Sequence, residues 1–290
     1  MACKIIVNRD SGNCERLDLE ALTCMLGCKD THIENITKAT DWSADGYDTV
    51  IVCGGDGTLH HAIDKCRDQQ IIYAPCGTLN EASATATTLT TVGKVNGESF
   101  SYVCACGSFT EIGYAAKNKH KQRWKSIAYL PQIFKQYRCH DIRASLTVDG
   151  EKIEENSYTL LMVLKSHRCF GFNFNHSYKR DKKLYLLAIK STGKDCLKNR
   201  AKMFFPFFRV FFCGISHPMS RKCWFLMPFD NLKVSLKDKQ DFCLDGEKRT
   251  LEGDLEITEQ ALDREIFIIK PPLCRRRKNK KYTNVNGRNL

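Results

Sequence analysis

Three segments in the N-terminal third of the chain combine glycine with small polar side chains in a way that suits phosphate binding. They read NRDSG (8–12), GGDGT (54–58) and APCGTLNEAS (74–83). Glycine lets a ligand approach backbone N–H groups closely, and N–H groups at helix N-termini attract anions. Asp56 and Glu81 carry carboxylates, the oxygen ligands that Mg²⁺ prefers beside phosphate. The segments therefore predict a phosphate-binding site that holds a magnesium ion.

Each of these segments follows a predicted buried strand, which indicates how they could meet. Strands are predicted at 4–8, 49–54 and 71–77, and helices at 14–26, at 58–67 and from Asn80 onward. The helices are indicated by apolar residues at a spacing of three to four. Alternating strands and helices are typical of a parallel sheet covered by helices. Since loops at the carboxyl ends of parallel strands share one crevice, we expect the three segments to lie together.

From about residue 98 the pattern changes to short strand-like runs separated by turns. Asp149-Gly150 is a strong signal for a tight hairpin, and one helix is predicted at 126–137. Such a series of strands indicates an antiparallel β-sandwich. The expected fold class is α/β plus β. It comprises a three-layer α/β nucleotide-binding domain (1–97), a β-sandwich domain for the substrate (98–272) and a basic, disordered tail (273–290).

Composition limits the class of protein. The chain has 290 residues, 42% of them hydrophobic, and a formal net charge of +12, which favours an anionic partner such as a nucleotide or an acidic membrane. Much of the positive charge is concentrated in 117–125 and 275–281. No reader motif or aromatic platform stands out, so nucleic-acid binding is not expected. The sixteen cysteines lack zinc-finger spacing and are predicted to be reduced, mostly buried thiols of a cytosolic protein.

Four motifs, in this order, resemble the diacylglycerol kinase and sphingosine kinase superfamily of lipid kinases. They are NRDSG (8–12), GGDGTL (54–59), Pro-Cys-Gly-Thr-Leu-Asn (75–80) and CLDGE (243–247). GSFTEIGYAA (107–116), followed by SIAYL (126–130), is similar to the segment that enters the second domain of soluble bacterial diacylglycerol kinase-like enzymes. The resemblance runs from about residue 4 to residue 270. It implies ATP- and Mg²⁺-dependent transfer of a phosphoryl group to the hydroxyl of diacylglycerol or a similar lipid.

The resemblance also implies roles for individual residues. Asp56 would lie near the phosphates and hold metal and water. Glu247 would accept the proton of the lipid hydroxyl, because a carboxylate within hydrogen-bond reach can act as a general base during phosphoryl transfer. Without the other motifs, the Asp-Gly of CLDGE would indicate only a hairpin turn. Contacts to ATP would come from Asn8, Arg9, Asp10, Ser11, Gly12, Thr37, Gly54, Gly55, Asp56, Gly57, Thr58, Thr78 and Asn80.

Some positions depart from the family pattern. His60 and His61 follow Leu59 where the family has Asn-Glu, and Glu81 replaces the usual aspartate. Adjacent histidines on a helix point about 100° apart, so a solvated helix face is expected there rather than a metal site. Lys182 replaces a glycine in a loop that often binds a structural magnesium in the family, so that metal site is not expected. The departures leave a weak or altered activity open.

The segment 197–214 combines six phenylalanines with four basic residues, which suits a membrane interface. The same phenylalanines could instead form core of the second domain, and the sequence does not separate these alternatives. The apolar stretch is too short to cross a bilayer and contains Arg209. Together with the basic run at 275–281 it makes an anionic membrane surface the expected partner, with a location that is cytoplasmic and peripheral at the inner membrane surface. A homodimer is also compatible with the sequence.

Two alternatives to a lipid kinase stay open. GGDGT is shared with NAD kinases, although such an enzyme would not need the third loop together with the late CLDGE. The substitutions after Leu59 are compatible with a catalytically silent protein that binds lipid or nucleotide. The sequence does not distinguish glycerol, sphingoid and other lipid alcohols.

Overall fold

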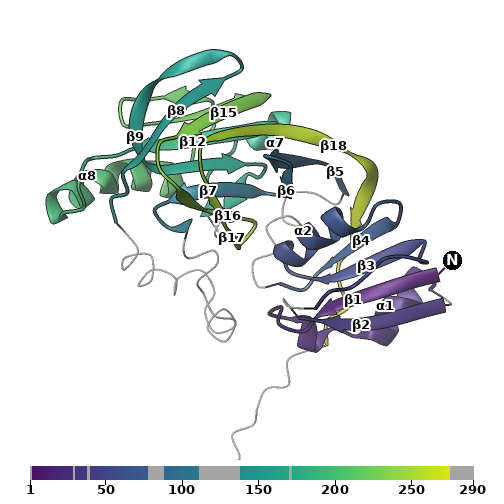
Figure 1. Ribbon diagram of the computed structural model, residues 1–290. Helices are drawn as coiled ribbons and strands as arrows, with labels where there is room; N and C mark the ends of the chain where they lie inside the picture. Colours follow the sequence, from purple (N-terminus) through teal and green to yellow (C-terminus); the bar gives the residue numbers. More distant parts are fainter. Residues whose placement is uncertain are drawn as a thin grey trace, which may run out of the picture.

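The computed structural model of the protein describes residues 2–28, 30–37, 40–77, 88–110, 138–169 and 172–274. It contains an α/β part and an antiparallel β part, so the expected fold class is confirmed. Figure 1 shows the two parts side by side, with β18 running from one to the other. The helices predicted from Asn80 and at 126–137, and the residues 275–290 of the predicted tail, lie outside the described residues.

The N-terminal part is a parallel sheet in the order β4-β3-β1-β2 with helices on both faces. Leu22 of α1 packs with Ile51 on one face, whereas Leu59 of α2 packs with Val52 on the other. These are the three predicted layers. The elements are β1 (Ala2–Asn8), a 3₁₀ turn (Cys14–Arg16), α1 (Leu19–Leu26), β2 (Asp30–Ile36), β3 (Thr49–Gly54), α2 (Asp56–Lys65) and β4 (Gln70–Pro75).

The second part is an antiparallel sandwich around a central apolar core. The N-terminal half of the long strand β9 pairs with β8, and its C-terminal half pairs with β7 and β12, so β9 takes part in both layers. Asp149 and Gly150, with φ of 49° and 87°, form the predicted hairpin turn between β8 and β9. The strands up to β11 are β5 (Thr88–Val95), β6 (Glu98–Phe100), β7 (Val103–Gly107), β8 (Ile142–Val148), β9 (Glu151–Leu164), β10 (Arg168–Cys169) and β11 (Phe172–Asn173).

A second apolar core lies on the outer face of the layer formed by β7, β9, β12 and β14. The helix α8 and the π-helical turn that follows it cover this face. Met203, Phe207 and Val210 are their buried contributions. The remaining elements are α7 (Tyr178–Asp181), β12 (Leu184–Lys190), α8 (Leu197–Phe207), the π-helical turn (Phe208–Phe212), β13 (Met219–Ser220), β14 (Trp224–Phe229), β15 (Asn231–Leu236), β16 (Gln240–Leu244), β17 (Glu247–Leu251) and β18 (Asp254–Ile268).

The strand β18 connects the two parts by hydrogen bonds. It begins beside β15 and β5 in the sandwich and ends beside β4 in the parallel sheet (Figure 1). The residues after it stay with the N-terminal part, because Ile269 N–H donates to Tyr73 O at 2.9 Å and Asp18 N–H donates to Pro272 O at 2.9 Å. The predicted division between residues 97 and 98 stays a prediction.

Local patterns located most elements, and the differences have physical causes. The helix predicted at 14–26 begins only at Leu19, because Asp18 caps it by accepting Ala21 N–H at 3.0 Å. The edge strand β2 was not predicted, since six of its seven residues are at least partly exposed and give no apolar run. All sixteen cysteines are free, as expected, and most are buried. Within the described ranges, none of the helices is sufficiently long and apolar to span a membrane.

Candidate functional site

The GGDGT loop joins the buried strand β3 to α2, and Asp56 is the first residue of that helix. The helix starts two residues before the predicted position 58, which places Asp56 and Thr58 in its first turn. Both are buried. Gly55 is the N-cap and offers no side chain to the first N–H groups of the helix. This helix start is therefore suited to an anion, because its N–H groups carry partial positive charge.

Asn8, the last residue of β1, connects the NRDSG loop to the GGDGT loop. Its Nδ2 donates to Thr58 Oγ1 at 2.8 Å, and its Oδ1 accepts Asp10 N–H at 3.1 Å. The backbone adds a turn in which Ser11 N–H donates to Asn8 O at 3.0 Å. One amide side chain thus fixes both the shape of the first loop and its position against α2.

The third loop is described as far as Gly77, and it lies against the other two loops. Gly77 N–H donates to Gly54 O at 3.1 Å, and Asn13 Nδ2 donates to Gly77 O at 3.0 Å. A Cβ placed on Gly55 would lie 3.3 Å from Ser11 Oγ and 3.7 Å from Gly77 Cα. The loops therefore meet at the carboxyl edge of the sheet, as predicted. Asn13 was not identified from the sequence, because a polar residue in a turn carries no distinguishing signal.

Two tyrosines lie near the Asp56 carboxylate. The Tyr73 hydroxyl is 3.2 Å from Asp56 Oδ1 and 3.4 Å from Gly54 O, both of which can accept its proton. Burial, and then the Asp56 charge, raises the pKa of Tyr73 well above its usual range. Burial likewise raises the pKa of Tyr102, with further contributions from the charges of Asp56 and Asp245. Both phenols are therefore neutral, and Tyr73 donates a hydrogen bond that orients Asp56.

Glu247 comes from near the end of the chain but lies beside the GGDGT loop. It begins β17 directly after the turn at Asp245 and Gly246, whose φ angles are 49° and 93°. Its Oε1 lies 3.2 Å, and its Cδ 3.8 Å, from the position that a Cβ on Gly57 would occupy. A side chain at position 57 would therefore crowd the carboxylate. The Asp-Gly pair is a hairpin turn, and this hairpin also brings Glu247 to the predicted phosphate site.

Asp245 fixes the position of that hairpin. Its Oδ1 accepts the N–H groups of Tyr102 and Val103, both at 3.0 Å. Its Oδ2 accepts the backbone N–H of Ser101 and, at 2.7 Å, the Ser101 hydroxyl. Burial raises the pKa of Asp245, and these hydrogen bonds act in the opposite direction. The carboxylate thus holds the β16–β17 turn against the chain that leads into β7.

We expect Asp245→Asn to lower the free energy of unfolding by about 2–4 kcal/mol, because an amide cannot accept all four hydrogen bonds and turns its NH₂ group toward buried donors. Urea unfolding followed by circular dichroism measures the change. Asp241→Asn is the matched control on the same hairpin, since Asp241 is exposed and its partners are the side chains of Lys248 and Thr250 on the neighbouring strand. The control should cost less than about 1 kcal/mol. Equal losses for both variants would contradict the assigned role of Asp245.

The two histidines after the loop have different environments. His60 is buried, with Nε2 3.3 Å from Asp64 Oδ2, and its Nδ1 has no hydrogen-bond partner in the described part of the chain. The expected solvated face is therefore wrong for His60. The cause is tertiary, because α2 lies against β6 of the second part. His61 is exposed at the surface of α2. Neighbouring atoms still desolvate part of its ring, which lowers its pKa; His60 and Arg249 act in the same direction, and Glu247 acts to raise the pKa.

The other predicted contacts lie around the edge of the site or outside the described residues. Arg9 turns toward β2, where its Nε donates to Asn35 Oδ1 at 2.6 Å. Thr37 follows β2, and its Oγ1 is 3.0 Å from Thr40 Oγ1. Asp10 belongs to the turn that Asn8 organises, and Gly12 lies in the next turn, where Cys14 N–H donates to Ser11 O at 3.0 Å. Thr78, Asn80 and Glu81 fall outside the described residues.

The described side chains fit a magnesium–phosphate group in chemical type. Asp56 supplies a carboxylate, and Ser11 and Thr58 supply hydroxyl oxygens, the hard donors that Mg²⁺ accepts alongside phosphate oxygens. No group of three or more His, Cys, Asp or Glu side chains gathers at a single point within the described ranges. In the loop where the family often binds a structural magnesium, Lys182 takes a left-handed conformation with φ of 59°.

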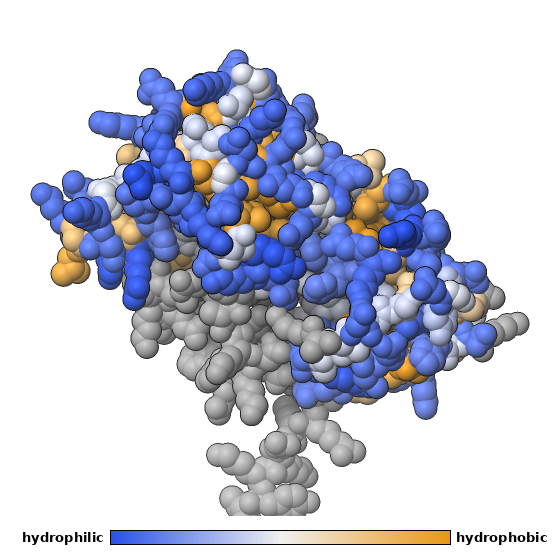
Figure 2. All heavy atoms as spheres, viewed as in Figure 1, coloured by the Kyte–Doolittle hydropathy of each residue, from blue (hydrophilic) through white to orange (hydrophobic). Residues whose placement is uncertain are grey.

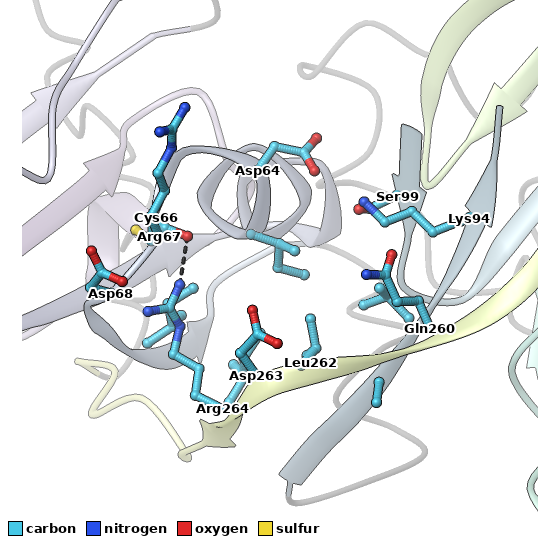
Figure 3. A pocket seen from close by; sticks show the side chains of 15 residues that line it. Asp64, Cys66, Arg67, Asp68, Lys94, Ser99, Gln260, Leu262, Asp263 and Arg264 are labelled. Carbon is cyan, nitrogen blue, oxygen red and sulfur yellow. Dashed lines mark hydrogen bonds between the residues drawn. The ribbon is translucent and has the colours of Figure 1, made fainter. Parts of the chain in front are cut away.

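A separate surface pocket of about 440 Å³ lies between the end of α2, β5 and β18. Figure 3 shows charged and polar side chains around it, including Asp64, Lys94, Ser99 and Gln260. Arg264 reaches across one side and donates to Cys66 O at 2.5 Å. None of the predicted site residues that are described lines this pocket, so it is distinct from the loops that meet at the carboxyl edge.

Comparison with known proteins gives one family and several related structures. Residues 3–102 match the family model described as the diacylglycerol kinase catalytic domain. No curated protein gives a significant match. The crystal structure of a diacylglycerol kinase from Bacillus anthracis str. Sterne has a TM-score of 0.62 at 17% identity, covering 93% of this chain and 97% of its own.

Two further solved structures are similar, and both are of proteins provisionally named diacylglycerol kinases from the same strain. One has a TM-score of 0.63 at 19% identity, with 93% of this chain and 97% of its own covered. The other has a TM-score of 0.64 at 18% identity, with 92% and 97% covered. At these identities the structures show a shared fold. The resemblance in the sequence is therefore confirmed: residues 3–102 match the model of the diacylglycerol kinase catalytic domain, and the chain has the fold of bacterial proteins that bear this name.

Proposed function

We propose that the protein is an ATP- and Mg²⁺-dependent lipid kinase that transfers the γ-phosphoryl group to the hydroxyl of diacylglycerol or a similar lipid alcohol. The product would be phosphatidic acid or its analogue. The observation that carries the proposal is the position of Glu247. A carboxylate from the second part of the chain lies against Gly57 in the loop that begins α2. A phosphate-binding loop and a candidate base therefore meet across the two parts.

Phosphoryl transfer to a lipid hydroxyl requires a general base, because a neutral alcohol is a poor nucleophile. Glu247 would take the proton of the lipid hydroxyl as its oxygen bonds to the γ-phosphorus. The bond between that phosphorus and the bridging oxygen of ADP would break, and ADP would leave with the electron pair. The phosphorylated lipid would then carry the new ester bond. The lipid hydroxyl would have to lie between Glu247 and the GGDGT loop, in the region where the two parts meet.

The loops would position the other reactant. The N–H groups at the start of α2 and the turn organised by Asn8 would face the phosphates of ATP. Asp56 would hold Mg²⁺, which when bound neutralises charge that builds up on the phosphate oxygens. Tyr73 would keep the Asp56 carboxylate in one orientation through the 3.2 Å contact to Oδ1. The resemblance implies the same division of roles between the loops and the late CLDGE motif.

The proposal is tested by an assay with labelled ATP and purified full-length protein. Mixed micelles of diacylglycerol, a sphingoid base and a monoacylglycerol are supplied as acceptors, and NAD is supplied in a parallel reaction. We expect label to appear in a lipid, to disappear when a chelator removes Mg²⁺, and to return when Mg²⁺ is restored. The acceptor that is labelled identifies the lipid class.

The alternatives predict different outcomes in this assay. Transfer to NAD and to no lipid would replace the proposal with an NAD kinase. Absence of transfer to every acceptor, with ATP or lipid still bound, would indicate a silent binding protein. The environment of His60 gives that second alternative its basis, because this buried histidine stands where the family has a different polar residue.

A further inference from the structure

Four phenylalanines form an exposed ridge along α8 and the π-helical turn. We define the phenylalanine ridge as Phe204, Phe205, Phe208 and Phe212, which are 47%, 73%, 44% and 59% exposed. Phe204 stacks on Phe208 with ring centroids 5.6 Å apart, and Phe208 stacks on Phe212 at 5.4 Å. Large apolar side chains this exposed and this contiguous commonly mark a surface that contacts a partner. Figure 2 shows hydrophobic surface at the tip of this helix, beside hydrophilic side chains.

The opposite face of the same helix is fixed to the sandwich. Met203, Phe207 and Val210 are buried in the second apolar core. Phe207 contacts Phe109 edge-on, with ring centroids 4.9 Å apart. The core alternative left open by the sequence is therefore correct for Phe207, whereas the ridge points outward. The ridge is presented by an anchored helix, so its outward direction does not depend on a free loop.

The charge around the ridge is positive. The stretch 197–222 contains no aspartate or glutamate, and its exposed basic residues include Lys198, Lys202 and Arg209. Cations at the border of an apolar surface suit an interface in which the rings enter the acyl region and the cations meet anionic headgroups. The described helices include none that could span a membrane, so such contact would be at the surface of the bilayer.

We propose that the phenylalanine ridge docks the protein on an anionic phospholipid bilayer. The proposal deepens the proposed function and rests on it in one respect, since a kinase for a membrane lipid has to meet its acceptor at the bilayer. A second copy of the chain fits the phenylalanine ridge less well than a bilayer does. An isologous contact through the ridge would bring the cations of both copies together, and like charges across an interface oppose association.

Docking is tested without catalysis, by flotation of the full-length protein with vesicles in the absence of ATP. One set of vesicles is pure phosphatidylcholine, and the other contains three parts phosphatidylcholine to one part phosphatidylserine. We expect Phe205→Ser/Phe208→Ser to weaken partitioning into the mixed vesicles by about tenfold or more, because two exposed rings that would enter the acyl region are lost. Phe267→Ser is the matched control, since Phe267 is 45% exposed on β18, away from the ridge. It should partition like the wild type.

The cations are tested separately. Lys198→Ala/Lys202→Ala should reduce binding to the mixed vesicles while leaving binding to phosphatidylcholine unchanged, and added salt should remove the difference between the two proteins. Equal partitioning of wild type, the ridge variant and Phe267→Ser would overturn the proposal. A lipid-free wild-type dimer that the ridge variant converts to a monomer would also overturn it, because the ridge would then be a subunit interface.

A kinase assay distinguishes failure of the docking proposal from failure of the proposed lipid kinase activity. The ridge variant should phosphorylate a short-chain lipid acceptor in free solution at the wild-type rate and should lose activity on acceptor held in vesicles. If the wild type phosphorylates no lipid, the proposed function fails, and vesicle flotation still decides whether the ridge binds membranes. If the ridge variant loses activity on the soluble acceptor while it binds vesicles like the wild type, the docking proposal fails.

Discussion

Asp56→Asn is expected to reduce kcat for phosphoryl transfer by at least about 10³-fold, which corresponds to about 4 kcal/mol of lost transition-state stabilisation. The amide has the shape of the carboxylate but cannot neutralise a divalent cation. The fold should be preserved, because the Tyr73 hydroxyl, 3.2 Å from Oδ1, can donate to an amide oxygen equally well. Initial rates at saturating ATP and Mg²⁺, together with thermal unfolding, measure both effects.

The matched control for this variant is Asp68→Asn. Asp68 is an exposed aspartate just beyond the end of α2, far along the helix from the loop. Its substitution should leave both rate and stability near wild type. A folded Asp56→Asn protein with the wild-type kcat would remove Asp56 from the proposed chemistry.

Glu247→Gln is expected to lower kcat by about 10²–10⁴-fold, the usual contribution of a positioned general base. The affinity for ATP should stay near wild type, since the loops that would hold the nucleotide come from the other part of the chain. The amide is nearly isosteric with the carboxylate that lies against Gly57, so the stability should change by no more than about 0.5 kcal/mol. Rates measured over a range of ATP concentrations separate the two kinetic effects.

Glu252→Gln provides the comparison just beyond the other end of the same strand, β17. Glu252 is exposed and lies between β17 and β18, outside the region of the loops. If both glutamine variants keep the wild-type rate, Glu247 is a hairpin residue without a catalytic role. A large loss of kcat that is confined to Glu247→Gln would support its role as the base. If the affinity for ATP fell by a similar factor, the substitution would instead have a structural effect on the GGDGT loop.

The elements that carry the site were predictable because their signals are local. A run such as TVIVCG followed by GGDGT indicates a buried strand, a sharp turn and a helix start without any knowledge of the remaining chain. The meeting of the loops then follows from the geometry of parallel strands. The position of Glu247 was suggested only by resemblance, since nothing local relates it to a loop nearly two hundred residues away.

The parts that escaped prediction depend on contacts between distant segments. The bond from Ser101 to Asp245 spans 144 residues, and in the sequence Asp245 indicates only a turn. In the sequence, Tyr73 looks like any other buried residue of the strand β4, so nothing local indicates its contact with Asp56. His60 faces away from the parallel sheet and was expected to be solvated, but the second part covers it. In each case the missing information is the packing of one part on the other.

The path of β18 has a consequence for the order in which the protein can be made. A ribosome releases the parallel sheet first, but that sheet completes its pairing beside β4 only with Phe267 and Ile268. Ile269 and Leu273, which pack against the core around α1, emerge later still. The edge of β4 therefore stays unpaired until most of the polypeptide has been synthesised. Pairing between strands this distant in the sequence slows folding and leaves strand edges open to aggregation. A chaperone that shields the edge of β4 during translation would meet this need, and expression of the N-terminal part alone would deprive it of its last strand.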